Sequence, residues 1–479
     1  MRSPAEQQPT SAYPYLLPYY RRHTAFTGMQ HQMKVVDLFC GAGGLSEGFR
    51  QAGFSIAAGA DSDPDAMATF AQNFPEAEAI TGNLSEPLVQ ERVLSHAHRA
   101  FVVVGGPPCQ AFSQVRNHSR VIDDPRNSLY REFVSILKKT IPPVFAMENV
   151  TGIEQMGVHN QIREDLSIDG EYKVSYQIVD AADFGVPQTR KRVIFIGVHH
   201  SMRIENSFLT GSNVTSLLSM SRQIKNDRVI YRVLHNNDTF GVQAYQDLNN
   251  PESLLAVTVS DAISDLSNLP VGNRNDSMDY RELPGPSSAY QKMMRQGCAQ
   301  QISNVQVPRI NSDTVLRLRA IPQGGNYRDL EGELLNRYLT DHRWGQSNGS
   351  GKLSRRHFYA YRRLHPSIWA WTLNTKADSV YHYNAYRALS VREFARIQSF
   401  PDRFVFTTDP RSGQLEGRHP GGPAHSRYRQ AGNAVPPLLA KRLALMLVQE
   451  LNARSDLRAD NFGTGEPHGG LAARWAAAR

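Results

Sequence analysis

The sequence predicts an α/β fold, in which a doubly wound, mostly parallel sheet is joined to a second, smaller and irregular domain. Between residues 34 and 198, short apolar runs alternate with helix-like segments, a pattern typical of parallel sheets covered by helices. Residues 201–385 lose this alternation and are rich in Asn, Ser, Gly and Arg. Helical patterns return at 389–400 and 436–451, so we expect the C-terminal part to complete the first domain.

The expected strands are short and apolar, and helical segments of about 10 to 15 residues separate them. In chain order they are KVVDLF, FSIAAGAD, FVVVGG, VFAMENV, KVSYQIVDAADF and RVIFIGV. Helices are expected after the first strand as far as Arg50, after the second as far as Phe74, and in SLYREFVSILKKT. The helix at 436–451 begins at a proline pair, which suits a first turn because proline lacks the N–H that is unpaired there.

The expected organisation has five parts. A flexible arm rich in Pro, Gln and Tyr occupies residues 1–32, and the layered domain follows at 33–200. The irregular domain occupies 201–400, a return segment with its helix 401–452, and a flexible tail 453–479. The sequence assigns no role to the arm, the tail or the glycine-rich loop at 411–425.

Composition excludes several classes of protein. No apolar run approaches the ~18 residues of a membrane span, and the first residues lack a signal-peptide pattern, so we expect a cytoplasmic protein. The three cysteines, Cys40, Cys109 and Cys298, are too few and too scattered for a disulfide framework or a Cys-rich zinc site. A net charge of +8 favours a polyanionic partner, although excess charge also serves solubility.

A glycine-rich turn, DLFCGAGGL at 37–45, follows the first strand and opens a helix. Glycines let the backbone approach a bound molecule, and the helix start supplies free N–H groups. The next strand ends in Asp61, where a carboxylate can accept hydrogen bonds from ribose hydroxyls. The pair indicates a cofactor that contains adenosine. It does not separate S-adenosylmethionine from a dinucleotide, although the glycine spacing is not GxGxxG.

A second group of residues indicates covalent chemistry. Cys109 follows the strand at 101–104, and Glu148 lies near the end of another strand, so both are expected at the carboxyl edge of the sheet. Arg190 and Arg192 are two residues apart and so lie on one side of an extended segment. A thiol of ordinary pKa, ~8.5, needs a neighbouring base or positive charge to react. A buried structural cysteine is the alternative. A thiol, a carboxyl group and two arginines suit attack on an electron-poor heterocycle.

At these residues the chain resembles the DNA cytosine-5 methyltransferase family, in its bacterial restriction-modification type. The motifs DLFCGAGG, GGPPCQAFS, ENV, QTRKR, RALSVREFARIQSFPD and RQAGNAVPP resemble those of the family and keep their order. They anchor residues 34–200 and 386–450, whereas the middle of the chain and both tails match poorly. The resemblance implies a Rossmann-like class I fold, a target-recognition domain at 201–400, and S-adenosylmethionine as the cofactor, with S-adenosylhomocysteine as its product.

The resemblance also implies roles for the catalytic residues. Cys109 would attack carbon 6 of a cytosine flipped out of the duplex, which makes carbon 5 nucleophilic enough to accept a methyl group. Glu148 would bind the N3 and N4 edge of the base, while Arg190 and Arg192 would hold its O2 side.

For the cofactor, the resemblance places Asp61 on the ribose and Asn83 near the adenine, where many relatives carry Asp. Ser62 stands where a bulkier residue is common, and Asn433 is expected to fix local backbone structure. The expected cofactor residues are Asp37, Phe39, Gly41, Gly43, Gly44, Leu45, Asp61, Ser62, Asn83, Pro107 and Asn433. No metal site is expected.

Double-stranded DNA is the expected partner. The polar, basic loop from Ser113 to Asn127 directly follows the nucleophile, and by resemblance it closes over the flipped base. Residues 342–365 are basic and aromatic and contain no acidic residue, a composition that can follow a phosphate backbone. The expected DNA contacts are Gln110, Ser113, Arg116, Arg343, Arg355, Arg356, Arg362 and Arg363. We expect a monomer that associates with the nucleoid through DNA, and a cognate restriction endonuclease, where one is present, that acts separately.

Three alternatives stay open. One branch of the family methylates cytosine in tRNA, but its recognition region is usually shorter than the region of about 185 residues here. A non-catalytic DNA-binding relative is disfavoured by the intact Cys109, Glu148 and arginine pair. A dinucleotide oxidoreductase is disfavoured by the absent GxGxxG turn. The target sequence cannot be deduced from the residues.

Overall fold

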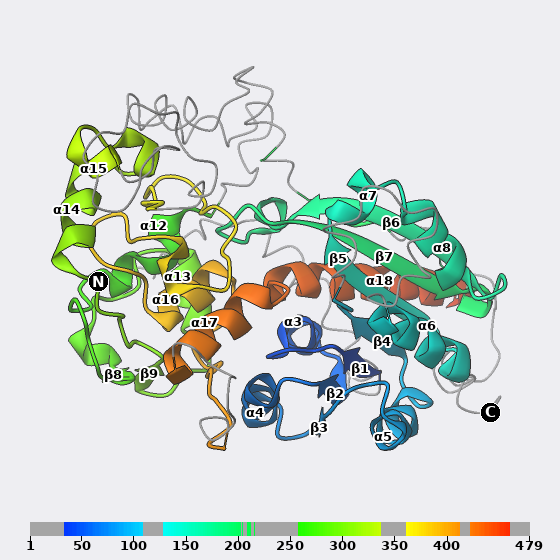
Figure 1. Cartoon of the computed structure of the whole chain (residues 1–479). Coiled ribbons are helices and arrows are strands. Elements are labelled where there is room, and N and C mark those ends of the chain that lie inside the picture. The colour runs from blue at the N-terminus through cyan, green and yellow to red at the C-terminus, as the bar shows by residue number, and fades with distance from the viewer. Residues whose placement is uncertain are drawn as a thin grey trace, which may run out of the picture.

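A seven-stranded sheet forms the centre of the computed structural model, which describes residues 33–108, 128–202, 204, 208–211, 215, 257–336, 361–411 and 422–459 (Figure 1). The strand order is β3-β2-β1-β4-β5-β7-β6. The strands are β1 (Lys34–Leu38), β2 (Ser55–Asp61), β3 (Glu78–Thr81), β4 (Val102–Gly105), β5 (Val144–Val150), β6 (Tyr172–Asp180) and β7 (Lys191–His199). Strands β1 to β5 are parallel to one another, and β7 is antiparallel to both of its neighbours. The predicted mostly parallel sheet is confirmed.

Helices cover both faces of the sheet, because alternate residues of each strand point to opposite faces. Val102 and Val104 of β4 belong to one apolar cluster, and Val103 belongs to the other. The first face packs against α3 (Gly44–Gln51), α4 (Pro64–Asn73) and α18 (Pro437–Ala459). The second packs against α5 (Pro87–Ala97), α6 (Ser128–Thr140) and α8 (His159–Ser167). The sheet is therefore doubly wound, as the sequence predicts.

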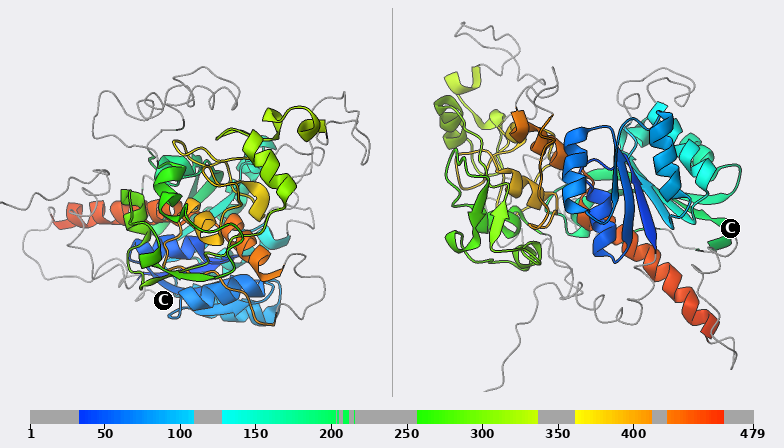
Figure 2. Two further views of the ribbon diagram at one scale, coloured as in Figure 1. Left: turned by 90° about the vertical axis from the view of Figure 1, so that its left-hand side faces the viewer. Right: turned by 90° about the horizontal axis from the view of Figure 1, so that it is seen from below.

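A second lobe lies beside the sheet (Figures 1 and 2). It contains the short sheet of β8 (Ser277–Asp279) and β9 (Gln301–Ser303). Its helices are α12 (Val259–Ile263), α13 (Ala289–Met294), α14 (Ser312–Ala320), α15 (Glu333–Asn336) and α16 (Val391–Ile397). Buried charges are stable only when they are paired, and here Arg396 contacts Asp265 and Asp402 while Arg387 contacts Glu393. These ion pairs fix α16 within the lobe, which we call the recognition lobe after the role that the sequence analysis expects for this region.

The C-terminal part of the chain joins the two lobes. Helix α17 (Gly422–Asn433) lies beside the recognition lobe, and α18 runs along α3 in the first domain (Figure 1). A Cβ atom at Gly48 would lie 2.3 Å from Cβ of Ala440, so the two helices approach each other at a glycine. Within the described residues, no helix is both long and apolar enough to cross a membrane.

Several elements differ from those expected. Helix α6 spans 128–140 as predicted, whereas α18 continues beyond the predicted end at 451 to Ala459. Helix α16 begins after the predicted start at 389 because Ser390 caps it, in a capping box with Glu393, and it ends at Ile397, before the predicted end at 400. Strand β3 and helix α5 were not among the predicted elements, since EAIT is too short to form a clear apolar run. The arm at 1–32, residues 412–421 and the tail after Ala459 lie outside the described residues.

Candidate active site

The candidate site lies at the carboxyl edge of the sheet, where β1, β2, β4 and β5 end. Strand β7 begins at the same edge, because it is antiparallel and its residue Arg192 pairs with Val150 at the end of β5. Open α/β sheets bind their ligands at this edge. The topology therefore brings the glycine-rich turn, the end of β5 and the QTRKR segment together.

The glycine-rich turn has a backbone that most residues avoid. Gly41 and Gly43 have φ of 52° and 98°, and Phe39, which is not a glycine, has φ of 56°. Gly43 occupies the N-cap of α3, and a Cβ atom there would lie 2.6 Å from the ring of Phe74. A side chain at Gly43 would therefore be strained both by the positive φ and by the close approach to Phe74.

Asp61 fastens this turn to the next strand. Its Oδ2 accepts the N–H of Gly41 at 2.9 Å, and its Oδ1 accepts the N–H of Asp63 at 2.8 Å. Burial raises the pKa of Asp61, and these N–H donors oppose the rise. Asp61 thus stands at the predicted place, beside the glycines.

Asp37 lies behind the turn. One of its oxygens accepts the N–H and the hydroxyl of Ser46, at 3.1 and 2.7 Å, and thereby anchors the start of α3. The other, Oδ1, is buried and has no hydrogen-bond partner among the described residues. Burial raises the pKa of Asp37 to about 7, and the nearby Asp61 adds to the rise.

These features fit a bound cofactor. The space in which a Cβ of Gly41 would lie contains no atom within 4 Å, and the unpartnered Asp37 Oδ1 can accept a further hydrogen bond. Ser62 and Asn83 are exposed at the ends of β2 and β3, and Asn83 Oδ1 accepts the N–H of Ser85 at 3.0 Å. The turn can therefore receive an adenosine compound.

Three other predicted cofactor residues are Gly44, Leu45 and Asn433. A Cβ at Gly44 would lie 2.2 Å from the carbonyl oxygen of Val435, so Gly44 gives the GNAVPP segment room against α3. Leu45 is buried in the core, and Asn433 is exposed, with its carbonyl oxygen 3.5 Å from Arg190 Nη2. Gly44 and Leu45 thus pack the start of α3 against the GNAVPP segment and the core.

The chemical part of the site centres on Glu148. Its Oε1 lies 2.6 Å from Nε of Arg192, and each of these side chains is 14% exposed. The neighbouring Asn149 donates its side-chain N–H to the carbonyl oxygen of Pro107 at 3.0 Å. A Cβ at Gly106 would lie 3.1 Å from Glu148 Oε2. The end of β5 is thus tied to the segment that leads to Cys109, which itself lies outside the described residues.

Arg190 departs from its predicted role. Its guanidinium is buried and donates to the carbonyl oxygens of Leu373 and Gly432, at 3.2 and 2.8 Å. Since the guanidinium faces these carbonyls in the protein interior, the prediction that Arg190 holds the base is corrected. Alternation along an extended segment predicts the face to which a side chain points, but not which other residues cover that face.

The chain is similar to known proteins over most of its length. The family model of the C-5 cytosine-specific DNA methylases matches residues 33–449. The chain belongs to this family. The type II methyltransferase M1.HphI of Haemophilus parahaemolyticus is 30% identical over 85% of both chains. M.DdeI of Desulfomicrobium norvegicum is 31% identical over 86% of this chain and 88% of its own.

A solved structure supports the fold. It is that of a putative DNA modification methyltransferase from an Escherichia coli prophage, which has a TM-score of 0.59 and 24% identity. It covers 88% of this chain and 99% of that one. As a C-5 cytosine-specific DNA methylase, this protein acts on DNA and uses S-adenosylmethionine as the methyl donor.

Most predicted DNA contacts of this methylase lie outside the described residues: Gln110, Ser113, Arg116, Arg343, Arg355 and Arg356. The side chain of Arg362 is half-buried, and its guanidinium lies 5.2 Å from the centre of the Trp371 ring. Arg363 is buried and donates to the carbonyl oxygens of Ile321 and Tyr383, at 2.8 and 2.9 Å. The prediction that Arg363 contacts DNA is therefore corrected, because its donors face the interior of the recognition lobe.

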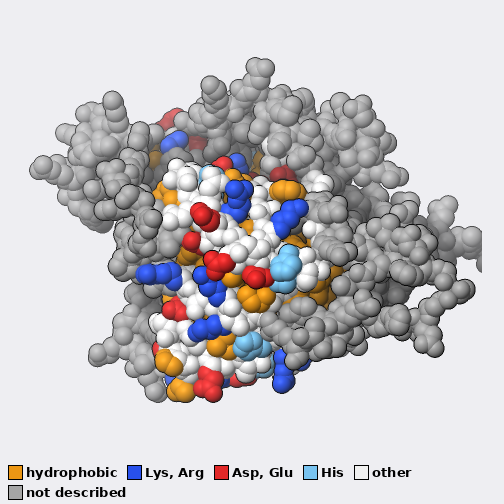
Figure 3. Space-filling view, turned by 90° about the vertical axis from the view of Figure 1, so that its right-hand side faces the viewer, with side chains coloured by type: hydrophobic (Ala, Val, Ile, Leu, Met, Phe, Trp, Pro, Cys, Tyr) orange, Lys and Arg blue, Asp and Glu red, His pale blue; other side chains and the backbone are white. Residues whose placement is uncertain are grey.

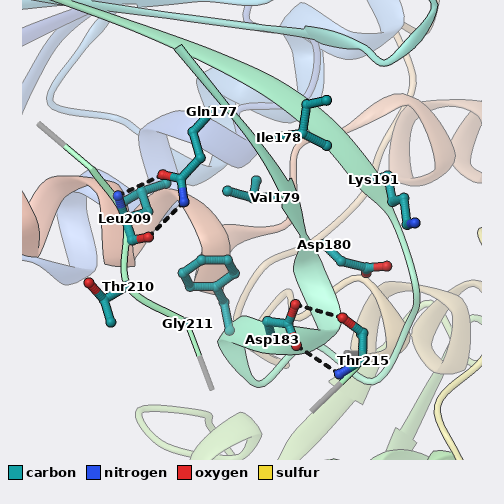
Figure 4. A pocket seen from close by; sticks show the side chains of 11 residues that line it. Gln177, Ile178, Val179, Asp180, Asp183, Lys191, Leu209, Thr210, Gly211 and Thr215 are labelled. Atoms are coloured by element: carbon teal, nitrogen blue, oxygen red, sulfur yellow. Dashed lines mark hydrogen bonds between the residues drawn. The ribbon is translucent and has the colours of Figure 1, made fainter. Parts of the chain in front are cut away.

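A cavity of about 430 Å³ opens beside the edge strand β6 (Figure 4). Asp180, Asp183 and Lys191 line it, together with residues of the segment 209–215. Asp183 accepts the N–H and hydroxyl of Thr215, and burial raises the pKa of Asp183. None of the predicted cofactor residues lines this cavity, so it is separate from the glycine-rich turn.

The opposite edge of the sheet has a polar cluster of Glu171, His199 and His200, whose donor atoms lie within 4.8 Å of one another. His199 Nδ1 accepts the N–H of Ser201 at 3.3 Å, which leaves its Nε2 to donate to Glu171 at 3.2 Å. These hydrogen bonds link His199 to both Ser201 and Glu171. The face that carries α8 shows acidic, basic and histidine side chains interspersed (Figure 3).

Proposed function

We propose that this methylase transfers a methyl group to carbon 5 of a flipped-out cytosine in a specific duplex sequence, with Cys109 as the nucleophile. The observation that carries the proposal is the contact between Glu148 and Arg192 beside the segment that leads to Cys109. It combines a hydrogen-bonding carboxyl group and a guanidinium at one edge of the sheet. Pro107 and Pro108 precede the thiol directly in the sequence.

The reaction requires a covalent step because the cytosine ring is a poor nucleophile at carbon 5. The sulfur of Cys109 forms a bond to carbon 6, and negative charge develops on the ring. Carbon 5 then gains the methyl group and loses its proton to a base, after which the bond between carbon 6 and sulfur breaks. The thiolate is thus regenerated.

Glu148 and Arg192 act on the same base. Glu148 accepts a hydrogen bond from the N4 amino group and, carrying a proton when the base is bound, donates it to N3 as negative charge develops there. Arg192 orients the Glu148 carboxyl group through the contact of 2.6 Å, its Nη1 donates to the carbonyl oxygen of Lys191 at 2.7 Å, and its Nη2 is the donor for the O2 side. Arg192 alone thus holds the O2 side of the base, a role that the sequence analysis gives to both Arg190 and Arg192.

The residues of the glycine-rich turn would hold the cofactor. The backbone at Phe39, Gly41 and Gly43 meets its methionine part, Asp61 accepts hydrogen bonds from the ribose, and Asn83 lies toward the adenine. Bound S-adenosylmethionine supplies the electrophilic methyl group that carbon 5 accepts. Asp61 is already fixed by two N–H donors, so little reorganisation is needed on binding.

The relatives named above are type II methyltransferases, and we propose the same restriction-modification setting for this chain. In that setting the enzyme acts as a monomer on nucleoid DNA, and any restriction endonuclease of the same specificity acts separately.

The test is a comparison of wild type with Cys109→Ser. Wild type is expected to transfer label from S-adenosylmethionine to duplex DNA, whereas the variant transfers none and still binds DNA. Bisulfite sequencing of the product reads the methylated position and the target sequence. Full activity of Cys109→Ser would remove the thiol from the mechanism, and label that enters only tRNA would replace the DNA substrate by RNA.

A further inference from the structure

Three segments that are far apart in the sequence meet directly before β7. The Gln188 backbone forms a parallel bridge with Ala370 of the recognition lobe, and the N–H of Thr189 donates to the carbonyl oxygen of Ala370 at 2.9 Å. Residues 431–433, at the end of α17, form the third segment. A Cβ at Gly432 would lie 2.0 Å from the carbonyl oxygen of Asn374, so the second and third segments are in direct contact.

A pair of buried glutamines connects the three segments. Gln188 Nε2 donates to Oε1 of Gln398 at 2.9 Å, and Gln188 Oε1 accepts the N–H of Leu373 at 2.8 Å. Gln398 Nε2 donates in turn to the carbonyl oxygen of Ala431 at 2.7 Å. Both side chains are fully buried, and an unpaired amide there would be costly. The amide pair thus specifies one arrangement of the segments.

Arg190 makes the second connection. Its guanidinium reaches Leu373 in the recognition lobe and Gly432 in the return segment through two different nitrogens. Its partners are carbonyl oxygens, and its Nε has no hydrogen-bond partner among the described residues. Burial and the repulsion of Arg192 lower the pKa of Arg190, while Glu148 opposes the change. Burial of a charge costs much free energy unless the charge is paired and hydrogen-bonded, so the two carbonyl contacts of Arg190 constrain its position strongly.

Asp180 fixes the backbone from which this arginine projects. Its Oδ1 accepts the N–H of Arg190 at 2.9 Å, and its Oδ2 accepts the hydroxyl of Thr189 at 2.7 Å. Arg192 follows two residues later, a distance of about 7 Å along a strand. A displacement of Leu373 or Gly432 would therefore move Arg190, and Arg192 would move with it because the chain between the two arginines is short and extended.

We propose that Arg190 is a positioning residue, which couples the recognition lobe and the return segment to the Glu148–Arg192 contact. When the recognition lobe is correctly placed, the carbonyls of Leu373 and Gly432 hold Arg190, and Arg192 meets Glu148 at the geometry that catalysis requires. The proposal rests on the proposed function, because it assigns no reaction to Arg190 itself.

The test compares Arg190→Lys with wild type in the full-length protein. Lysine keeps the charge but cannot reach two carbonyls with a planar fork. We expect kcat for methyl transfer to unmethylated genomic DNA to fall about 10- to 100-fold, since misplacement by about 1 Å costs that much. The KM values for DNA and for S-adenosylmethionine should stay within about threefold.

Arg392→Lys is the matched control. Arg392 is also buried, and it donates to the carbonyl oxygens of Ser303, Pro401 and Phe404, all within the recognition lobe or its border with the return segment. This variant should lose a similar amount of thermal stability while kcat stays within about twofold of wild type. If Arg190→Lys does not fold, Gln398→Met, which removes the amide pair at nearly constant volume, provides the same comparison.

The outcomes separate the two proposals. Absence of 5-methylcytosine with wild type refutes the proposed function itself. Given an active wild type, a fall in kcat for Arg190→Lys but not for Arg392→Lys supports the inference. Equal kcat in wild type and Arg190→Lys reduces Arg190 to a structural residue, and a raised KM for DNA at constant kcat makes it a DNA contact; either result overturns the inference.

Discussion

Removal of the Arg192 guanidinium should cost this methylase much of its activity. Two unit charges about 4 Å apart attract by about 4 kcal/mol at an effective dielectric constant of about 20. Nε of Arg192 and Oε1 of Glu148 are 2.6 Å apart, and each side chain is 14% exposed. Allowing for solvent and desolvation, we expect Arg192→Met to lose about 2 to 3 kcal/mol of transition-state stabilisation. That is about 30- to 150-fold in kcat/KM.

The assay is the initial rate of labelled methyl transfer to DNA, for Arg192→Met, Glu148→Gln and the double variant. If the two side chains act together, the losses of the single variants will not add in the double variant. Arg92→Met serves as the control, because Arg92 pairs with Glu78 on the exposed surface of α5 and β3. Activity of Arg192→Met within about threefold of wild type, or strictly additive losses, would refute the reasoning.

Two further predictions concern the glycine-rich turn and its supports. Gly48→Ala should destabilise the protein by about 1 to 3 kcal/mol, because the added Cβ would lie 2.3 Å from Ala440. Gly285→Ala is the control, because its added Cβ would meet no atom within 4 Å, and it should leave the stability unchanged. Equal thermal unfolding temperatures of the two variants would contradict this prediction. The pKa of Asp37 is raised from 3.8 to about 7, so the native state keeps the proton of Asp37 at a pH where the unfolded chain has lost it. The free energy of unfolding therefore falls as the pH rises from about 4 to about 7. This fall amounts to about 4 kcal/mol, and Asp37→Asn should lack it. Denaturant unfolding across this pH range measures the difference, and parallel pH profiles of wild type and variant would refute the prediction.

The fold was predictable because its signal is local. Most strands of the sheet contain an apolar run, and the recognition lobe is built from residues beyond 200, where this pattern is lost. The antiparallel direction of β7 has no local signal, because a strand reads the same in either direction. That direction is what brings Arg192 to the edge where Glu148 lies.

The site was predictable as a set of residues but not as a set of contacts. Gln188 and Gln398 stand within the recognised motifs QTRKR and RALSVREFARIQSFPD, yet nothing in the sequence pairs them across 210 positions. Arg190 and Arg192 look equivalent in the sequence, and the structure separates them, one in the interior and one at the active edge. Burial decides this difference, and burial depends on segments that arrive from elsewhere in the chain.

The sequence by itself determined the family, the glycine-rich turn, Asp61 and the identity of the expected nucleophile, because glycines, a carboxylate after a strand and a motif order are properties of neighbouring residues. Only the tertiary structure decided which arginine meets Glu148, because the partners of a buried guanidinium are the carbonyls of residues far away, such as Leu373 and Gly432. Hydrogen bonding in the interior must be satisfied by whatever the fold places there, and a linear pattern does not contain that information.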